Sequence, residues 1–209
     1  MTKKLTGKDI LLLLLYLPGK TDKKNEPIIG RTRLTKMIYI FNKELKNNFD
    51  HLDESTLPDF FAYDYGPFSK DLLDDIQFFV NIDFVIEKVE EIQQTTADYE
   101  ESEYNYNEEI GFGNVKSMEN DPPNLYSYRL AEKGIEFVEE NILENISKQQ
   151  KEYLTKFKRK INTLSLDSIL SYVYNKYPNA AENSLIRSDY IAEAGAKNDW
   201  IWNCRRLLY

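Results

Sequence analysis

An unbroken run of apolar side chains near the N-terminus sets the strongest limit on how this chain folds. Residues 10–17 read ILLLLLYL and carry no charge. A helix that spans a bilayer needs about 20 such residues, so this run is too short to cross a membrane. Lysines precede it as in a signal peptide, but Asp9 borders it and no small-residue cleavage site follows. We therefore predict a buried helix over residues 9–17 and no membrane segment.

Cysteine and histidine are nearly absent from the 209 residues, which contain one cysteine, Cys204, and one histidine, His51. A lone cysteine cannot form an internal disulfide, which favours a reducing, cytoplasmic location. A histidine-based catalytic triad would depend on His51, which stands in a polar linker, and we expect an exposed loop residue there. Cys204 as a nucleophile would depend on the distant His51, so we expect a half-buried structural thiol.

The formal net charge of −8 conceals a strong segregation of charge along the chain. Residues 1–46 carry 11 Lys/Arg against 4 Asp/Glu, and residues 148–209 carry 11 against 6. Residues 47–86 carry 1 against 9, and residues 87–121 carry 2 against 11. Both ends are therefore basic and the middle is acidic. Either the ends pack against the middle, or the protein has two functional faces of opposite charge.

Apolar periodicity predicts several helices after the first one. The stripe within residues 31–48 predicts a helix with Arg33, Lys36 and Lys43 on its opposite, solvent-exposed side. Further helices are predicted over residues 69–80, 131–146, 148–164 and 165–177, strands at residues 60–65, 84–88 and 125–130, and an exposed loop over residues 18–30. The final residues, 188–209, are apolar enough to dock on the rest.

A Gly-Pro pair interrupts the stretch FAYDYGPFSKDLLDDI, residues 61–76. Pro67 fixes its own φ angle and keeps the preceding residue out of the helical region, and Gly66 accepts the backbone angles of a bend. The pair is predicted to end an extended run so that a helix begins. Ser69 is the expected N-cap of that helix, with Asp71 in its first turn, where a carboxylate suits the helix dipole.

The order of these elements is three helices, a strand, a long loop, a strand and a helix. This order is typical of a winged helix whose wing is greatly enlarged. We therefore predict an α+β, mainly helical protein with a winged-helix-like core. Residues 1–147 form this domain, with an acidic insert at about 90–122 as the wing. Residues 148–209 form a C-terminal helical extension packed on it.

Signatures of catalysis are weak throughout the sequence. The segment LPGKT at residues 17–21 resembles the end of a phosphate-binding loop, but Leu14 stands where that motif needs glycine. Asp71, Asp74 and Asp75 lie close together on one predicted helix and could bind magnesium in an enzyme or nuclease subunit, although a solvated acidic face is the commoner outcome. We predict no enzyme, no cofactor and no metal site, and we keep the aspartates as a third hypothesis.

A nucleic-acid hypothesis rests on the helix predicted at residues 31–48. It would act as a recognition helix in the major groove of DNA. Its basic side chains would bind phosphates, and a side-chain amide would form hydrogen bonds with a base edge. The candidate residues are Arg31, Arg33, Lys36, Asn42 and Lys43. The predicted wing opposes this hypothesis, because its net charge of −9 over residues 87–121 would be repelled by a duplex. A solvated basic face is the alternative interpretation.

The acidic insert agrees better with a protein partner than with DNA. Its segment ADYEESEYNYNEE, residues 97–109, combines tyrosine anchors with a charged frame that can enter a basic site. The candidate contacts in the insert are Tyr99, Glu100, Glu101, Tyr104 and Tyr106. The alternative is a surface insertion without a binding role.

Two motifs, taken in order, resemble the Panacea or SocA-like family and its YwgA-like relatives. The first is RTRLTKMIYIFNKEL, in which Leu34 and Lys36 match a leucine-x-lysine helix. The second is FFAYDYGPFSKDLLDDI, in which Tyr65, Gly66 and Pro67 match an aromatic run that ends in Tyr-Gly-Pro. The resemblance covers about residues 8–86. It implies a cytosolic, non-enzymatic protein that often acts as an antitoxin by neutralising a toxin or presenting it for proteolysis.

The leading hypothesis is therefore a partner-binding regulator of antitoxin type. Its expected contacts are the five insert residues together with Tyr65, Gly66 and Pro67. A winged-helix DNA-binding regulator is the second hypothesis. The identity of the partner and the oligomeric state are left open.

Overall fold

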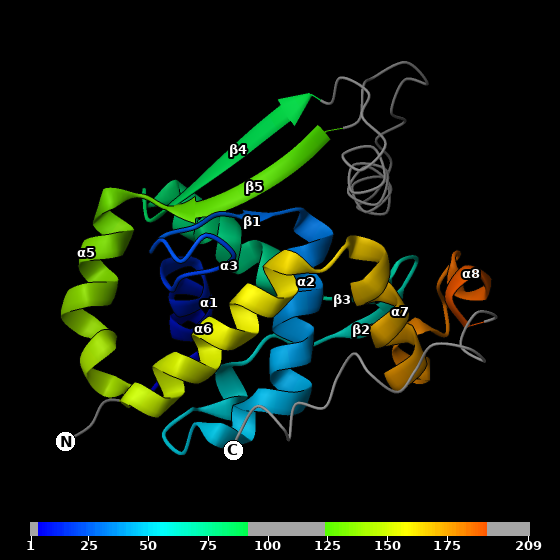
Figure 1. Ribbon diagram of the computed structural model, residues 1–209, viewed down its shortest axis with the longest axis horizontal. Coiled ribbons are helices and arrows are strands. Elements are labelled where there is room, and N and C mark those ends of the chain that lie inside the picture. The colour runs from blue at the N-terminus through cyan, green and yellow to red at the C-terminus, as the bar shows by residue number, and fades with distance from the viewer. Residues whose placement is uncertain (1–3, 92–123, 192–209) are drawn as a thin grey trace.

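The computed structural model describes residues 4–91 and 124–191. Figure 1 shows the helix α2 near the centre, α1 and α6 beside it, a small sheet above, and a second hairpin with α7 and α8 at one end. The elements in chain order are α1 Gly7–Tyr16, β1 Ile28–Ile29, α2 Arg31–Ile40, β2 Phe61–Tyr63, β3 Gly66–Phe68, α3 Lys70–Asn81, β4 Val85–Glu91, β5 Asn124–Leu130, α5 Glu132–Asn141, α6 Lys148–Thr163, α7 Leu166–Lys176 and α8 Arg187–Ile191. The predicted α+β, mainly helical class is confirmed.

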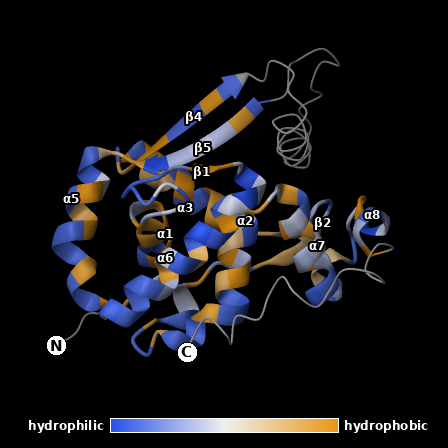
Figure 2. Ribbon diagram, in the orientation of Figure 1, coloured by the Kyte–Doolittle hydropathy of each residue, from blue (hydrophilic) through white to orange (hydrophobic). Residues whose placement is uncertain are grey.

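The first helix is buried along its length, as its apolar run predicts. It begins at a capping box, in which the Thr6 hydroxyl accepts from the Asp9 amide and the Asp9 carboxylate accepts from the Thr6 amide. It ends where Leu17 adopts an extended conformation. Figure 2 shows orange over α1, whereas α5 and α6 alternate between hydrophilic and hydrophobic residues. No helix among the described residues is long and apolar enough to span a membrane.

Helix α2 departs from the prediction in the environment of its basic residues. Every residue from Thr32 to Ile40 is buried. Arg33 and Lys36 are 7% and 0% exposed, so the prediction that they lie on a solvent-exposed side is wrong. These residues are buried because α2 has neighbours on several sides: it contacts β1 and β3 as well as α6 and α7. After α2 the chain continues through a π-helical turn, Phe41–Leu45.

Three antiparallel strands form the larger sheet in the order β1-β5-β4. The strands β4 and β5 pair from Val85 with Leu130 to Glu91 with Asn124. The two residues of β1 pair with Tyr128 and Ser127 of β5. The prediction of strands at 84–88 and 125–130 is confirmed, but β1 lies in a segment predicted to be loop.

The Gly-Pro pair is not a boundary between a strand and a helix. Gly66 and Pro67 lie inside β3, where Gly66 pairs with Tyr63 and Pro67 with Ala62 of β2. Gly66 has φ of +85°, a conformation that side chains with a Cβ rarely adopt. The helix α3 begins after Ser69, whose hydroxyl accepts from the Leu72 amide, so the predicted N-cap is confirmed.

The C-terminal helices share the core with the N-terminal ones. The Nζ of Lys158 on α6 is buried and lies within hydrogen-bond distance of the carbonyl oxygens of Leu15, Leu17 and Glu26, at 3.1, 2.7 and 2.6 Å. These acceptors belong to the end of α1 and the following loop, where carbonyl groups lack helical partners. A single hydrophobic cluster runs from Leu5 to Tyr190. The described part of residues 148–209 is therefore bound tightly to the preceding elements.

Candidate interaction surface

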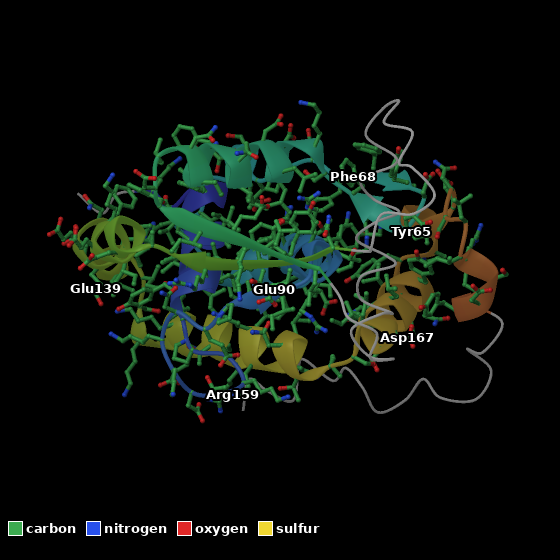
Figure 3. The ribbon with its side chains drawn as sticks, turned by 90° about the horizontal axis from the view of Figure 1, so that it is seen from above. Tyr65, Phe68, Glu90, Glu139, Arg159 and Asp167 are labelled. Carbon is green, nitrogen blue, oxygen red and sulfur yellow. The ribbon has the colours of Figure 1, made fainter. Side chains whose placement is uncertain are left out.

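The face of the larger sheet that points away from the helices carries exposed apolar and charged side chains. We call it the outer sheet face. Figure 3 shows it from above, with β4 and β5 crossing the front of the molecule and no described helix over them. Its residues are Ile29, Ile86, Lys88, Glu90, Leu125, Ser127 and Arg129, and they line a shallow hollow of about 370 Å³ together with Pro27 and Glu87.

The register of the strands explains why these side chains share one face. Ile29 and Lys88 both pair with Ser127, and Ile86 pairs with Arg129. Directly paired residues of antiparallel strands project to the same side of a sheet. Ile29 is 44% exposed and Ile86 is 36% exposed. Ile29 and Ile86 are thus two exposed apolar side chains on one face, separated by β5 and bordered by Lys88, Glu90 and Arg129.

The opposite face of the same sheet is held to the core by Arg31. Its guanidinium carbon lies 3.9 Å from the centre of the Tyr126 ring, a cation–π contact. Its Nε donates to the Tyr128 hydroxyl at 3.1 Å, and its Nη2 lies 3.6 Å from the Glu87 carboxylate. Burial raises the pKa of the Tyr128 hydroxyl well above its usual value, so this hydroxyl remains protonated. The outer sheet face is therefore carried by a well-anchored sheet.

The acidic insert begins and ends at the far end of this sheet. Glu91 and Asn124 are paired residues, so residues 92–123 connect two neighbouring positions at the tip of the β4–β5 hairpin. Figure 1 shows this tip extending away from the helices. The predicted partner contacts Tyr99, Glu100, Glu101, Tyr104 and Tyr106 lie outside the described residues.

The predicted nucleic-acid residues do not form one surface. Arg33 donates to the carbonyl oxygens of Ile29, Ile161 and Leu164, and Lys36 donates to that of Pro67. Arg31 is engaged with the sheet, as described above, and the Asn42 amide donates to Pro58 O. Lys43 is exposed. The assignment of Arg33 and Lys36 to phosphate contacts is corrected, because buried cations that bind backbone carbonyls cannot reach a duplex.

The Tyr-Gly-Pro residues are also internal. Tyr65 is 8% exposed, and Gly66 and Pro67 are buried. A Cβ on Gly66 would lie 2.6 Å from Cε1 of Tyr174, so α7 packs directly against this backbone. In the folded chain these three residues support the hairpin and do not present a surface to a partner, which corrects their assignment to partner contacts. Figure 3 places Tyr65 and Phe68 away from Glu90 on the sheet.

The three aspartates of α3 each have a different neighbour. Asp74 pairs with Lys70 at 2.7 Å, Asp75 binds Lys8, and Asp71 accepts from the Asp59 amide at 3.2 Å. Across residues 4–91 and 124–191 no group of three or more potential metal-ligating side chains comes together. His51 is exposed in a loop, as predicted. Cys204 lies outside the described residues.

Sequence reasoning missed the outer sheet face. The sequence predicts a strand around Ile86, but it does not tell which face of a sheet the side chain joins without the pairing partner. Ile29 stands among turn-forming residues, in a two-residue strand too short for periodicity to reveal. The available signal was the dipeptide of β-branched residues at 28–29, which favours extended structure.

Comparison of the chain with protein-family models, with curated proteins and with solved structures found no match.

Proposed function

We propose that this protein is a non-enzymatic, partner-binding regulator of antitoxin type. The observation that carries the proposal is the attachment of the acidic insert to Glu91 and Asn124 at the tip of the β4–β5 hairpin, whose strands carry the outer sheet face. The insert supplies negative charge and tyrosines, and the sheet supplies Ile29, Ile86 and Arg129. Tyrosine and arginine are enriched among the residues that anchor protein interfaces, and the charge around them guides association.

The proposal includes a winged-helix-like core. The elements α1, β1, α2, α3, β4 and β5 follow the chain order of that fold, and the sheet order β1-β5-β4 agrees with it. The wing would be the β4–β5 hairpin with its insert. The hairpin β2–β3 between α2 and α3 is an addition to this pattern. The acidic side chains of α3, Asp71, Asp74 and Asp75, favour a protein partner over a duplex in such a fold.

The resemblance to the Panacea or SocA-like family supports the antitoxin part of the proposal. It rests on two motifs, and both lie in the interior of the protein. They therefore bear on the architecture of the core, whereas the choice of partner is assigned to the insert and the outer sheet face. A toxin is the expected partner, in a toxin–antitoxin or phage-related system.

Replacement of residues 95–121 by a short Gly-Ser linker tests this proposal. Because Glu91 and Asn124 remain paired, we expect the variant to fold with an unchanged circular dichroism spectrum. We expect recovery of the protein partner in affinity capture to fall at least tenfold. Growth should stop when the captured partner is expressed alone and resume when this protein is co-expressed. A variant that unfolds, or that binds its partner unchanged, would count against the proposal.

A further inference from the structure

The larger sheet has two edge strands, β1 and β4, because its strand order is β1-β5-β4. Figure 1 shows β4 as the uppermost strand, with β5 and β1 below it. A strand at the edge of a sheet carries backbone amides and carbonyls that no neighbouring strand binds, so it can receive a further strand. Natural edge strands are commonly short, whereas β4 has 7 residues. The outer edge of β4 is therefore a candidate binding site.

The pairing register shows which backbone groups of β4 face this outer edge. In an antiparallel pair of strands, hydrogen-bonded and non-hydrogen-bonded residue pairs alternate. The Ala131 amide donates to the Phe84 carbonyl at 2.9 Å, directly before the first pair of the β4–β5 ladder, so the even-numbered residues of β4 bind β5. The amides and carbonyls of Glu87 and Val89 therefore point away from β5. Within the described ranges these four groups form no hydrogen bond.

The edge at β1, on the opposite side of the sheet, is closed by the protein itself. The Arg33 Nε donates to the Ile29 carbonyl at 3.1 Å, and the Asn162 side-chain amide donates to the Pro27 carbonyl at 3.3 Å. Pro27 has no amide hydrogen to offer to a further strand. Side chains from α2 and α6 thus occupy the positions that an added strand would take beside β1.

The outer edge of the smaller hairpin is closed in a similar way. The Ala62 carbonyl accepts from the Asn183 side-chain amide at 3.2 Å, and the Asp64 carbonyl accepts from the Leu185 amide at 2.8 Å. These donors belong to the segment between α7 and α8. In the described part of the chain, the edge of β4 beyond Val85 differs from these edges because no side chain or loop occupies it.

The side chains of β4 also favour an added strand. Helix α3 contacts β4, and Val85 at the start of the strand is 3% exposed, but Val89 is 48% exposed. Alternation along the strand places Val89 on the face opposite to Ile86, which is exposed on the outer sheet face. A strand beside β4 would therefore find an exposed apolar neighbour on each face, and cross-strand contacts of this kind stabilise sheets.

The charges around this edge favour a basic segment over an acidic one. Residues 70–90, which form α3 and most of β4, carry 2 Lys/Arg against 6 Asp/Glu. Each cation near these carboxylates is already paired, in the contacts Lys70–Asp74, Lys88–Glu90, Lys8–Asp75, Arg31–Glu87 and Lys133–Asp83. The insert attached to β4 adds further negative charge in its sequence. Lysine or arginine in an approaching segment would be attracted, whereas Asp or Glu would be repelled.

We propose that the outer edge of β4 binds an extended, basic segment of the protein partner as an added β-strand. The backbone of this segment forms hydrogen bonds with the amides and carbonyls of Glu87 and Val89. Its alternate apolar side chains contact Ile86 on one face and Val89 on the other. This inference rests on the proposed function, because it states how the partner of that function is bound.

Two substitutions of one residue test the backbone contact. Val89→Pro and Val89→Ala both remove the exposed isopropyl group, but only proline also removes the amide hydrogen. Because this amide points away from β5, proline costs no bond of the β4–β5 ladder, and both variants should keep the circular dichroism spectrum of the wild type. In affinity capture with the full tagged chain, we expect Val89→Pro to recover about tenfold less partner than Val89→Ala.

The outcomes of this capture separate the inference from the proposed function. Equal recovery of the partner by Val89→Pro and Val89→Ala would overturn strand addition at β4 and leave the proposed function standing. Absence of any protein partner with the wild type would overturn the proposed function, and the inference with it.

A measurement on the partner tests the same hydrogen bonds with the wild-type protein, and so does not depend on the folding of Val89→Pro. Overlapping peptides of the captured partner are titrated with the full chain by fluorescence anisotropy. The peptide that binds should carry a net positive charge. Methylation of every second backbone amide should weaken its binding about tenfold in one of the two alternate sets and leave it unchanged in the other, because only one set faces β4. An equal effect of both sets, or a binding peptide that is acidic, would overturn the proposal.

Discussion

The Lys36 ammonium donates a hydrogen bond of 3.2 Å to the carbonyl oxygen of Pro67 inside the core. This contact joins the leucine-x-lysine helix directly to the Tyr-Gly-Pro segment. The two motifs that suggested a family resemblance are thus neighbours in space, and they hold the hairpin β2–β3 against the central helix. We infer a structural role for both of them.

Replacement of Lys36 by methionine is expected to destabilise the protein. Methionine fills a similar volume but leaves the Pro67 carbonyl without its donor, and an unsatisfied buried polar group typically costs about 1–3 kcal/mol. Urea denaturation should show this decrease in the free energy of unfolding. Lys43→Met, an exposed change two turns further along the chain, should stay within about 0.5 kcal/mol of the wild type. Equal stability of the two variants would contradict the structural role of Lys36.

Gly66→Ala is expected to destabilise the hairpin for two reasons. The positive φ of Gly66 disfavours a Cβ by about 1–2 kcal/mol, and the new atom would overlap the ring of Tyr174. Thermal denaturation should show a lower melting temperature. In a double-mutant cycle, Gly66→Ala should be less destabilising in a Tyr174→Leu background, because the overlap is gone and only the backbone strain remains. An effect that does not change in that background would mean that the ring is not involved.

The buried Lys158 makes stability depend on pH. Burial lowers the pKa of this lysine to about 7, below the usual 10.5 of the unfolded chain. Between these two values the unfolded chain binds more protons, so the free energy of unfolding rises with pH, by up to about 1.4 kcal/mol per unit. The stability difference between the wild type and Lys158→Met should therefore grow from pH 7 to pH 10. A constant difference would show that Lys158 remains charged when it binds its three carbonyls.

Glu26 is expected to make the free energy of unfolding depend on pH in the acidic range. Burial by itself raises the pKa of this carboxyl, but hydrogen bonds from Thr21, Asn162 and the Lys20 amide outweigh it and lower the pKa to about 2. The stabilisation is present above pH 4.5 and is lost as the pH falls toward 2. Glu26→Gln should therefore be less stable than the wild type at pH 6, with a difference that shrinks on acidification. A difference independent of pH would exclude this ionisation as the cause.

The helices were predictable because their apolar residues follow a single period. The run at residues 10–17, the Ser69 cap and the strands around Val85 and Leu130 each depend on local sequence, and the structure confirms them. Burial of a helix on several sides cannot be predicted from the period of its apolar residues. Periodicity assigns the residues opposite an apolar stripe to solvent, and this rule fails for α2, where Arg33 and Lys36 bind carbonyls from distant segments.

The candidate sites depended on contacts between segments far apart in the sequence. The outer sheet face exists because Ile29 and Ile86 lie on either side of β5, although 56 residues separate them along the chain. Likewise, Lys43 lies beside Tyr39 as its i, i+4 neighbour, but the hollow that it lines together with Phe60 and Pro178 follows from the docking of β2–β3 and α7 on α2. Such pairings cannot be derived from local patterns alone.

Affinity capture with three forms of the tagged protein tests partner binding through the outer sheet face most directly. The forms are the wild type, Ile29→Lys/Ile86→Lys on the outer sheet face, and Phe78→Lys, an equally exposed apolar position on α3. The bound fraction is analysed separately for proteins and nucleic acids. We expect one stoichiometric protein partner with the wild type and with Phe78→Lys, and at least tenfold less of it with the double variant. Duplex DNA without a protein partner, or equal recovery from all three forms, would contradict the proposed function.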